Sequence, residues 1–233
     1  VYIWNAELLG AILPDLRSLL PDCRLIAGGP EAGYDADAWL KRHPELDLVV
    51  QGPGERAAAE LVQRRFDTSA WPDRVLKAVP VPLSGLPFPY RPDDWSKLDH
   101  RYVYYETSRG CPFRCSYCLS SRDDQRPDLR DLGMVMDELD LLAGRGPALV
   151  KLVDRSFNAP PERARAIWER LIRKHGRGQT RWHFEVHPRF LGNDDFRLLA
   201  DAPAGLFQFE LGVQTVHDAG RALVDRPAGW ARE

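Results

Sequence analysis

Apolar residues along the N-terminal part of the chain alternate between short strand-like runs and segments with helical spacing. Strands are expected over Val1–Trp4, Arg24–Ala27 and Leu46–Val50, because each is a brief apolar run closed by a polar residue or a glycine-rich turn. Helices are expected over 36–42 and 56–66, where apolar residues recur every three or four positions. This strand–helix alternation predicts a doubly wound, Rossmann-like parallel sheet.

The same alternation returns after residue 100 and continues to the end of the chain. Four predicted strands are each followed by a predicted helix. The strands span 101–106, 148–153, 181–186 and 206–211, and the helices span 134–142, 161–174, 194–200 and 217–224. Consecutive units of this kind predict half or more of a parallel β/α barrel, with functional residues at the carboxyl ends of its strands.

A proline-rich segment separates the two patterns. Six prolines fall within it, which is incompatible with a regular helix or a central strand. They are Pro72, Pro80, Pro82, Pro87, Pro89 and Pro92. We therefore expect an α/β protein of three parts: a partial doubly wound domain over 1–67, a linker over 68–100 and a partial parallel barrel over 101–233.

Composition narrows the class of protein. Hydrophobic residues make up 44% and charged residues 28% of the 233, as in ordinary globular domains. The net charge of −2 provides no basic field for nucleic acid. No apolar run approaches the roughly 20 residues of a membrane span, and no secretory signal is visible at the start. Cysteine usage does not suggest a disulfide framework, so we expect a cytoplasmic protein. The chain starts at Val1 without a Met and stops soon after the last helix, so we expect a fragment cut at both ends.

The most specific chemical signal is a cluster of three cysteines. Cys111, Cys115 and Cys118 follow the first predicted barrel strand at C-x3-C-x2-C spacing, and only Cys23 lies elsewhere. Three thiolates on one loop suit an iron–sulfur cluster, leaving one iron open for a further ligand. A zinc site remains an alternative, with a fourth ligand drawn from Cys23, His100 or His187. Ordinary packed thiols are a second alternative.

Polar residues also follow the other predicted barrel strands. These are Asp154 and Asn158 after the second strand, Glu185 and His187 on the third, and Glu210, Gly212 and Gln214 on the fourth. Charges inside a barrel are costly unless they meet a ligand or each other, so these residues are candidates for ligand contacts. The alternative is that the two glutamates point outward or pair with arginines.

Glycine pairs follow strands in the N-terminal part. Gly28 and Gly29 end the strand 24–27, and Gly52 and Gly54 follow the strand 46–50. Glycine at the end of a parallel strand lets the backbone approach a ligand closely. Tight turns between strand and helix would explain the same residues without a ligand.

Several segments together resemble the radical SAM superfamily, in particular its members with an N-terminal cobalamin-binding domain. The resemblance covers nearly the whole chain in order, and the cysteine signature is its most specific part. The matching segments are Gly28–Glu31, Gly52–Glu55, Tyr104–Phe113, the cysteine loop to Cys118, Val153–Asn158, His183–Glu185 and Phe209–Thr215.

The resemblance implies site residues and an activity. Cys111, Cys115 and Cys118 would ligate a [4Fe–4S] cluster, and S-adenosylmethionine (SAM) would chelate the open iron. Reductive cleavage of SAM would give a 5′-deoxyadenosyl radical, with cobalamin expected to serve methyl transfer or related radical chemistry. Tyr117 would flank the adenine. The resemblance further implies cofactor contacts from Asp154, Glu185, Glu210 and Gln214 in the barrel, and from Gly28 and Gly29 in the first domain.

Alternatives within this reading stay open. The Asp-x-His-x-x-Gly motif of many cobalamin-binding domains does not occur, and the resemblance places it before Val1. The protein would then be a cobalamin-dependent enzyme, a radical SAM enzyme that only abstracts hydrogen, or a non-catalytic metal-binding remnant. Expected partners are a small-molecule substrate and an electron donor such as flavodoxin or ferredoxin, with no membrane and no nucleic acid. No catalytic residue is assigned, and the fragment need not be active alone.

Overall fold

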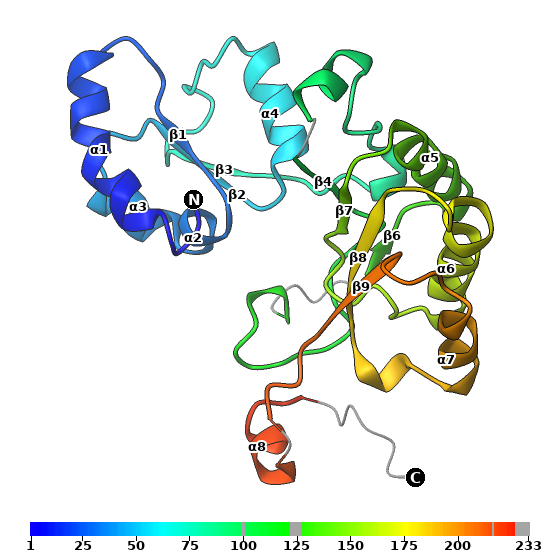
Figure 1. Ribbon diagram of the computed structural model, residues 1–233. Coiled ribbons are helices and arrows are strands. Elements are labelled where there is room, and N and C mark those ends of the chain that lie inside the picture. Colours follow the sequence, from blue (N-terminus) through cyan, green and yellow to red (C-terminus); the bar gives the residue numbers. More distant parts are fainter. Residues whose placement is uncertain (99–100, 122–126, 216, 227–233) are drawn as a thin grey trace. The chain divides into compact units, whose positions relative to one another are not determined.

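A computed structural model describes residues 1–98, 101–121, 127–215 and 217–226. The chain divides into two compact units, Val1–Val81 and Pro82–Glu233. Figure 1 shows the helices and strands of both units along the chain. Residues 68–81, assigned to the linker from sequence, thus lie within the first unit.

The first unit is built on a three-stranded parallel sheet in the order β1-β2-β3. Its elements are α1 (Ala6–Leu19), β1 (Ile26–Ala27), α2 (Pro30–Tyr34), α3 (Ala36–Arg42), β2 (Leu48–Gln51), α4 (Gly54–Gln63) and β3 (Val75–Lys77). Side chains of β2 alternate between two cores. Val49 packs with Trp39 of α3, whereas Leu48 and Val50 pack with Leu61 of α4. Helices therefore cover both faces, which confirms the predicted doubly wound arrangement.

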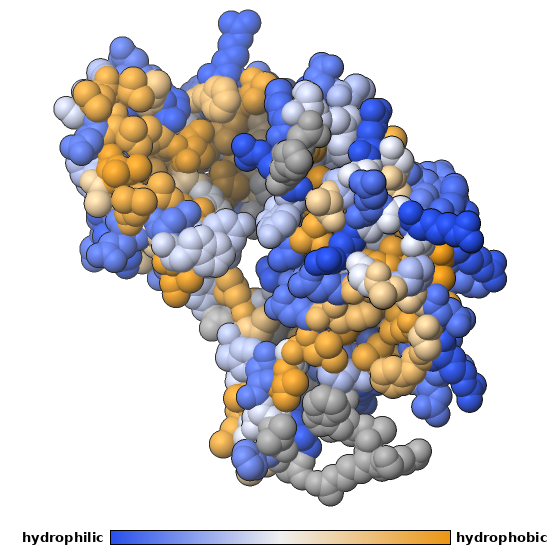
Figure 2. Space-filling model, in the orientation of Figure 1, coloured by the Kyte–Doolittle hydropathy of each residue, from blue (hydrophilic) through white to orange (hydrophobic). Residues whose placement is uncertain are grey.

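The predicted strand at Val1–Trp4 is wrong. Asn5 closes a turn instead: its backbone N–H donates to the carbonyl of Tyr2 at 3.0 Å, and its side chain accepts from the Tyr2 N–H at 2.8 Å. Trp4 is 77% exposed, so the apolar run that suggested a buried strand lies at the surface. Apolar residues also gather over the outer face of α1, as Figure 2 shows.

The second unit is organised by a four-stranded parallel sheet in the order β4-β7-β8-β9. The sheet strands are β4 (Tyr102–Tyr105), β7 (Leu149–Leu152), β8 (Arg181–Val186) and β9 (Phe207–Leu211). The helices are α5 (Leu132–Arg145), α6 (Pro161–His175), α7 (Asn193–Ala200) and α8 (Asp218–Leu223). Short elements complete the unit: η1 (Leu83–Gly85), η2 (Pro92–Lys97), β5 (Ser108–Arg109), η3 (Leu119–Ser121), β6 (Asp128–Leu129) and η4 (Pro188–Phe190). The alternating parallel strands and helices confirm the predicted partial barrel.

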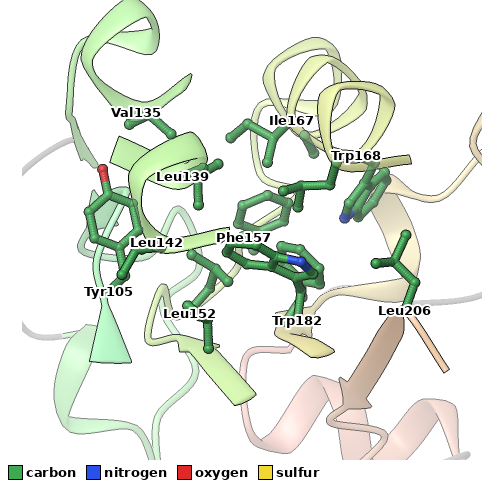
Figure 3. Packing of buried hydrophobic residues seen from close by; sticks show 14 of the residues in the cluster. Tyr105, Val135, Leu139, Leu142, Leu152, Phe157, Ile167, Trp168, Trp182 and Leu206 are labelled. Carbon is green, nitrogen blue, oxygen red and sulfur yellow. The ribbon is translucent and has the colours of Figure 1, made fainter. Parts of the chain in front are cut away.

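Helices α5, α6 and α7 lie along one face of this sheet (Figure 1). Aromatic rings fill the space between the two layers, as Figure 3 shows for Phe157, Trp168 and Trp182. The Phe157 and Phe184 rings lie 4.5 Å apart, and Trp168 meets Phe184 edge to face at 6.1 Å. Because successive strand residues point to opposite faces, His183 and Glu185 of β8 point away from this core.

One edge of the sheet carries a side-chain contact. The hydroxyl of Tyr90 donates to the Tyr104 carbonyl at 2.7 Å and accepts from the Tyr104 N–H at 2.8 Å. Tyr90 thus satisfies both backbone groups of a β4 residue on the side away from β7.

Candidate functional site

The carboxyl ends of the second-unit strands surround a cavity of about 220 Å³. Its wall contains residues that follow β4, β7, β8 and β9, the topology expected for a site at this end of parallel strands. Seven of the ten residues to which the resemblance gives a cluster or cofactor contact line it: Cys111, Cys115, Tyr117, Cys118, Glu185, Glu210 and Gln214. Of the remaining three, Asp154 belongs to the same unit and the two glycines belong to the first.

The cysteine loop is tied at its base by a two-stranded ribbon. Strands β5 and β6 pair antiparallel, with Ser108 opposite Leu129 and Arg109 opposite Asp128. Gly110 follows with φ of +96°, a backbone conformation that glycine adopts without strain. The three cysteines therefore lie in the segment that joins the two strands of this ribbon.

The three cysteines line one cavity in unequal environments. Cys115 is buried, whereas Cys111 and Cys118 are partly exposed. The Cys111 Sγ lies 3.5 Å from the Ser156 Oγ, which follows β7. Within the described ranges, no three Cys, His, Asp or Glu side chains already form a metal-binding group. All three thiols line the same cavity, and because each cysteine of a [4Fe–4S] cluster binds a different iron, they need not form a group that chelates one ion.

Asp154 holds the loop rather than lining the cavity. Its buried carboxylate accepts hydrogen bonds from the Thr107 N–H at 3.1 Å, the Thr107 hydroxyl at 2.6 Å and the Ser108 hydroxyl at 2.6 Å. Burial raises the pKa of Asp154, against the lowering effect of these three donors. Its position fixes the chain between β4 and the cysteines. A cofactor contact from Asp154 stays a prediction.

Glu185 and Glu210 are register partners on β8 and β9, and both line the cavity. Burial and then the charge of Glu210 raise the pKa of Glu185. Glu210 also lies 3.3 Å from the His183 Nε2. The cavity therefore carries two neighbouring carboxyl groups, which favour a ligand with positive charge.

Gln214 lies on a tight bend beyond β9. Its φ is +53°, in the left-handed region that few non-glycine residues adopt. A Cβ on Gly212 would come within 2.9 Å of the Gln214 Nε2, so glycine leaves room for the amide side chain.

Arg226 is a cavity residue that sequence reasoning missed. Its guanidinium donates to the Tyr117 hydroxyl at 2.8 Å, to the Gly212 carbonyl and to the Cys115 Sγ at 3.7 Å. A backbone bond from the Ser116 N–H to the Val224 carbonyl, 3.0 Å, fastens the same segment to the cysteine loop. No motif marks this arginine, because its role depends on the chain returning to the loop after α8.

His187 lines the cavity, and Asn158, which is not part of the lining, holds His187 in place. The Asn158 side chain accepts from the His187 N–H at 2.8 Å and donates to the His187 carbonyl at 3.0 Å. The His187 ring lies 4.2 Å from that of Phe113 in the cysteine loop. Burial lowers the pKa of His187 to about 4, with smaller effects from the charges of Arg226 and Arg189. Both residues were among the polar strand-end candidates predicted from sequence, and His187 was also named as an alternative zinc ligand.

Gly28 and Gly29 lie after β1 in the first unit. Gly29 has φ of +92° and precedes α2 as its N-cap. A Cβ at Gly29 would lie 2.7 Å from the Val1 nitrogen, so the turn tolerates no side chain there. This geometry explains Gly29 as a tight turn, and ligand contact by the pair remains a prediction.

Comparison with known proteins identifies the family. A sequence model described as the radical SAM superfamily matches residues 105–232, more than half of the chain. The chain belongs to the radical SAM superfamily. This membership confirms the resemblance drawn from the cysteine signature. In the described part of this radical SAM chain, no helix is long and apolar enough to cross a membrane.

Several characterised proteins are similar to this radical SAM chain. The 2-(S-pantetheinyl)-carbapenam-3-carboxylate methyltransferase of Streptantibioticus cattleyicolor is 27% identical over 71% of the chain. The cobalamin-dependent radical SAM methyltransferase TokK of Streptomyces tokunonensis is 26% identical over 84% of the chain. The chain spans only 28% and 32% of these relatives' lengths.

Solved structures support the fold. The radical SAM methyltransferase TsrM of Kitasatospora setae, solved with tryptophan and a SAM analogue bound, matches with a TM-score of 0.65 at 20% identity. The match covers 92% of this chain and 46% of TsrM. A second TsrM structure, with cobalamin and a [4Fe–4S] cluster bound, matches with a TM-score of 0.62. The α/β fold predicted from sequence is therefore confirmed in both parts of the chain.

Proposed function

We propose that this chain carries the cluster and SAM sites of a cobalamin-dependent radical SAM enzyme, acting as a methyltransferase on a small molecule. The observation that carries the proposal is the cavity at the strand ends, which Cys111, Cys115 and Cys118 line together. Cysteine thiolates are the ligands of [4Fe–4S] clusters, so the donor set fits that group. Three thiolates would leave one iron free for SAM.

The remaining wall suits a ligand of mixed charge. SAM has a sulfonium, an ammonium and a carboxylate. Glu185 and Glu210 provide negative charge for its cationic groups, while Arg155 and Arg226 provide positive charge. Tyr117, between two cysteines, offers an aromatic face. Gln214 offers an amide that can donate and accept.

The protein's contribution is to hold these groups in place. When bound, the cluster supplies the electron for reductive cleavage of SAM. Asp154 fixes the start of the cysteine loop, and the Arg226 contacts tie its middle to the segment after α8. These contacts would keep the cysteine loop in position when the cluster and SAM are bound.

The cobalamin part of the proposal rests on the relatives. The name of TokK includes cobalamin dependence, and one TsrM structure contains cobalamin. The first unit is a doubly wound sheet, an architecture that binds ligands beyond the carboxyl ends of its strands. Gly28 and Gly29 are the candidate contacts there. The domain predicted over 1–67 would include β3 as well, so that the linker predicted over 68–100 begins only after Val81. An electron donor such as flavodoxin or ferredoxin and a cytoplasmic location complete the proposal.

Anaerobic reconstitution with iron and sulfide tests the proposal. The chain should turn brown, absorb broadly near ~400 nm and take up about four irons. SAM should then change the electron paramagnetic resonance (EPR) spectrum of the reduced cluster, since it binds the open iron. A chain that keeps its three cysteines but takes up one zinc and no iron would refute the proposal. Cobalamin retention by a longer protein containing both units separates the methyltransferase from an enzyme that only abstracts hydrogen.

A further inference from the structure

His187 is held rigidly beside the cysteine loop. Its backbone N–H and carbonyl are both bonded to Asn158, which is itself buried. Its ring packs against Phe113, a residue between Cys111 and Cys115. The whole residue is only 4% exposed. A ring fixed by these contacts cannot turn freely to find a partner.

The hydrogen bonds of the ring leave one atom without a partner. The Arg189 N–H donates to Nδ1 at 3.2 Å, which makes Nδ1 the acceptor. The proton of a neutral imidazole must then lie on Nε2. Nε2 is buried and has no hydrogen-bond partner among the residues that the structure describes. Leaving such a buried donor unpaired is unfavourable, so an acceptor is expected in the functional state.

The surroundings indicate which acceptor that is. The two carboxyl groups in the cavity wall, Glu185 and Glu210, make no bond to Nε2, and the burial of Nε2 excludes bulk water. The ring instead packs against the cysteine loop and lines the same cavity as the three thiols. Sulfur atoms of a cluster held by those thiols would be acceptors for a nearby N–H.

We propose that the Nε2–H of His187 donates a hydrogen bond to a sulfur of the cluster held by Cys111, Cys115 and Cys118, and thereby raises its reduction potential. This inference rests on the proposed function. A hydrogen bond to sulfur stabilises the reduced cluster more than the oxidised one, because the reduced cluster carries more negative charge. His187 is therefore a positioning and tuning residue rather than a cluster ligand.

Two substitutions test the roles of the two ring nitrogens of His187 separately. His187→Asn keeps an acceptor near the position of Nδ1 for the Arg189 N–H but does not extend to Nε2. His187→Gln extends an amide N–H toward the Nε2 position. Both variants and the wild type are reconstituted, and the fraction of reduced cluster is measured by EPR at fixed potentials. At the wild-type midpoint, the His187→Asn substitution should lower the ratio of reduced to oxidised cluster about tenfold, ~59 mV for one electron. The His187→Gln substitution should restore most of that loss.

A measurement on the wild type does not depend on how the variants fold. With 15N-labelled histidine, pulsed EPR should detect a weak coupling between the reduced cluster and a histidine nitrogen. The His187→Asn variant, where it loads iron, should lose that coupling. Its absence from the loaded wild type would overturn the inference.

The remaining outcomes also decide the matter. Equal potentials in all three fully loaded proteins would overturn the inference while leaving the proposed function intact. Unchanged potentials with SAM affinity weakened tenfold in His187→Asn, measured by calorimetry, would assign the donor to SAM and overturn it as well. Failure of the wild type to take up a cluster would instead refute the proposed function.

Discussion

The two ends of the four-stranded sheet differ in what surrounds them. A hollow of about 640 Å³ lies at the amino ends, beside Trp95, Arg145 and Gln179. The cavity at the carboxyl ends is about 220 Å³. Among the described residues, the lining of the larger hollow includes no cysteine, histidine or carboxylate, and its arginine stacks over Trp95 at 5.5 Å. The smaller cavity has all of these groups, so converging chemistry marks the site better than volume does.

The strongest test of this contrast removes the cysteines. Cys111→Ala, Cys115→Ala and Cys118→Ala should each lose nearly all iron–sulfur absorbance after reconstitution, because each removes a proposed ligand. Iron content per chain is the measurement. Cys23→Ala, in the first unit, and Arg145→Ala, at the other end of the sheet, are the controls and should load normally. Full iron uptake by any of the three cavity variants would remove that cysteine from the site.

Substitution of Asp154 tests whether this buried carboxylate stabilises the carboxyl end of the sheet. Asp154→Ala leaves the Thr107 N–H and two hydroxyls without their acceptor. We expect unfolding free energy to fall by about 3 kcal/mol, since bonds to a buried carboxylate are stronger than neutral ones. Urea denaturation measures the loss. Asp93→Ala, at an exposed position of η2, is the matched control and should change little. A similar small effect of Asp154→Ala would contradict the anchoring role.

His187 makes the stability of the carboxyl end sensitive to pH. The folded chain holds the pKa of His187 at about 4, below the roughly 6.5 of an unfolded histidine. Between these values the unfolded chain binds more protons, so His187 makes the metal-free chain less stable as pH falls from about 6.5 to 4. After allowance for solvent screening, the expected loss is about 1 kcal/mol. Urea denaturation at pH 7 and pH 5 should show a smaller loss in His187→Gln than in the wild type. The exposed His217→Gln should behave like the wild type, and an unchanged slope in His187→Gln would contradict the prediction.

A substitution in the helix layer, at Asp140, should have the smallest effect on stability. It should not alter the site at the carboxyl ends of the strands. Burial raises the pKa of Asp140 on α5, but hydrogen bonds from Arg170, Lys174 and His175 outweigh it and lower the pKa overall. A lowered pKa stabilises the fold above the unfolded value of about 3.9, and this stabilisation is lost as pH falls further.

Asp140→Asn should therefore cost roughly 0.5 kcal/mol at pH 7, given that these partners are partly exposed. Thermal denaturation at pH 7 and pH 3 should show the difference from the wild type shrinking in acid. Glu169→Gln, in a mostly exposed pair with Arg173, is the control and should give no measurable effect. Iron uptake should be unchanged in both variants, and a loss of iron in Asp140→Asn would link the helix layer to the site.

The regular parts of the fold follow from local pattern. The predicted strand over 181–186 coincides with β8, because every second residue there is apolar and packs on the helices. The predicted helix over 36–42 coincides with α3. By contrast, β3 lies within the proline-rich segment and escaped prediction. It has only three residues and, among the residues that the structure describes, pairs with β2 alone, so tertiary contact rather than sequence pattern defines it.

The site was predictable where residues are consecutive or end a strand. The cysteines, Glu185 and Glu210 meet these conditions, and the cavity contains all of them. Arg226 does not, because its place depends on how the chain folds back after α8. The Nε2 of His187 is left without a partner because of contacts with the Arg189 N–H and with Asn158. No spacing of residues along the sequence predicts those contacts.

The Tyr90 hydroxyl has a consequence for how the sheet meets other strands. By bonding both backbone groups of Tyr104, it occupies positions that a foreign strand would need on the outer side of β4. β9, at the opposite border, pairs only with β8 within the described residues. The two borders of the sheet therefore differ. The Tyr90 hydroxyl blocks strand pairing at Tyr104 on β4, whereas a further strand can pair beside β9.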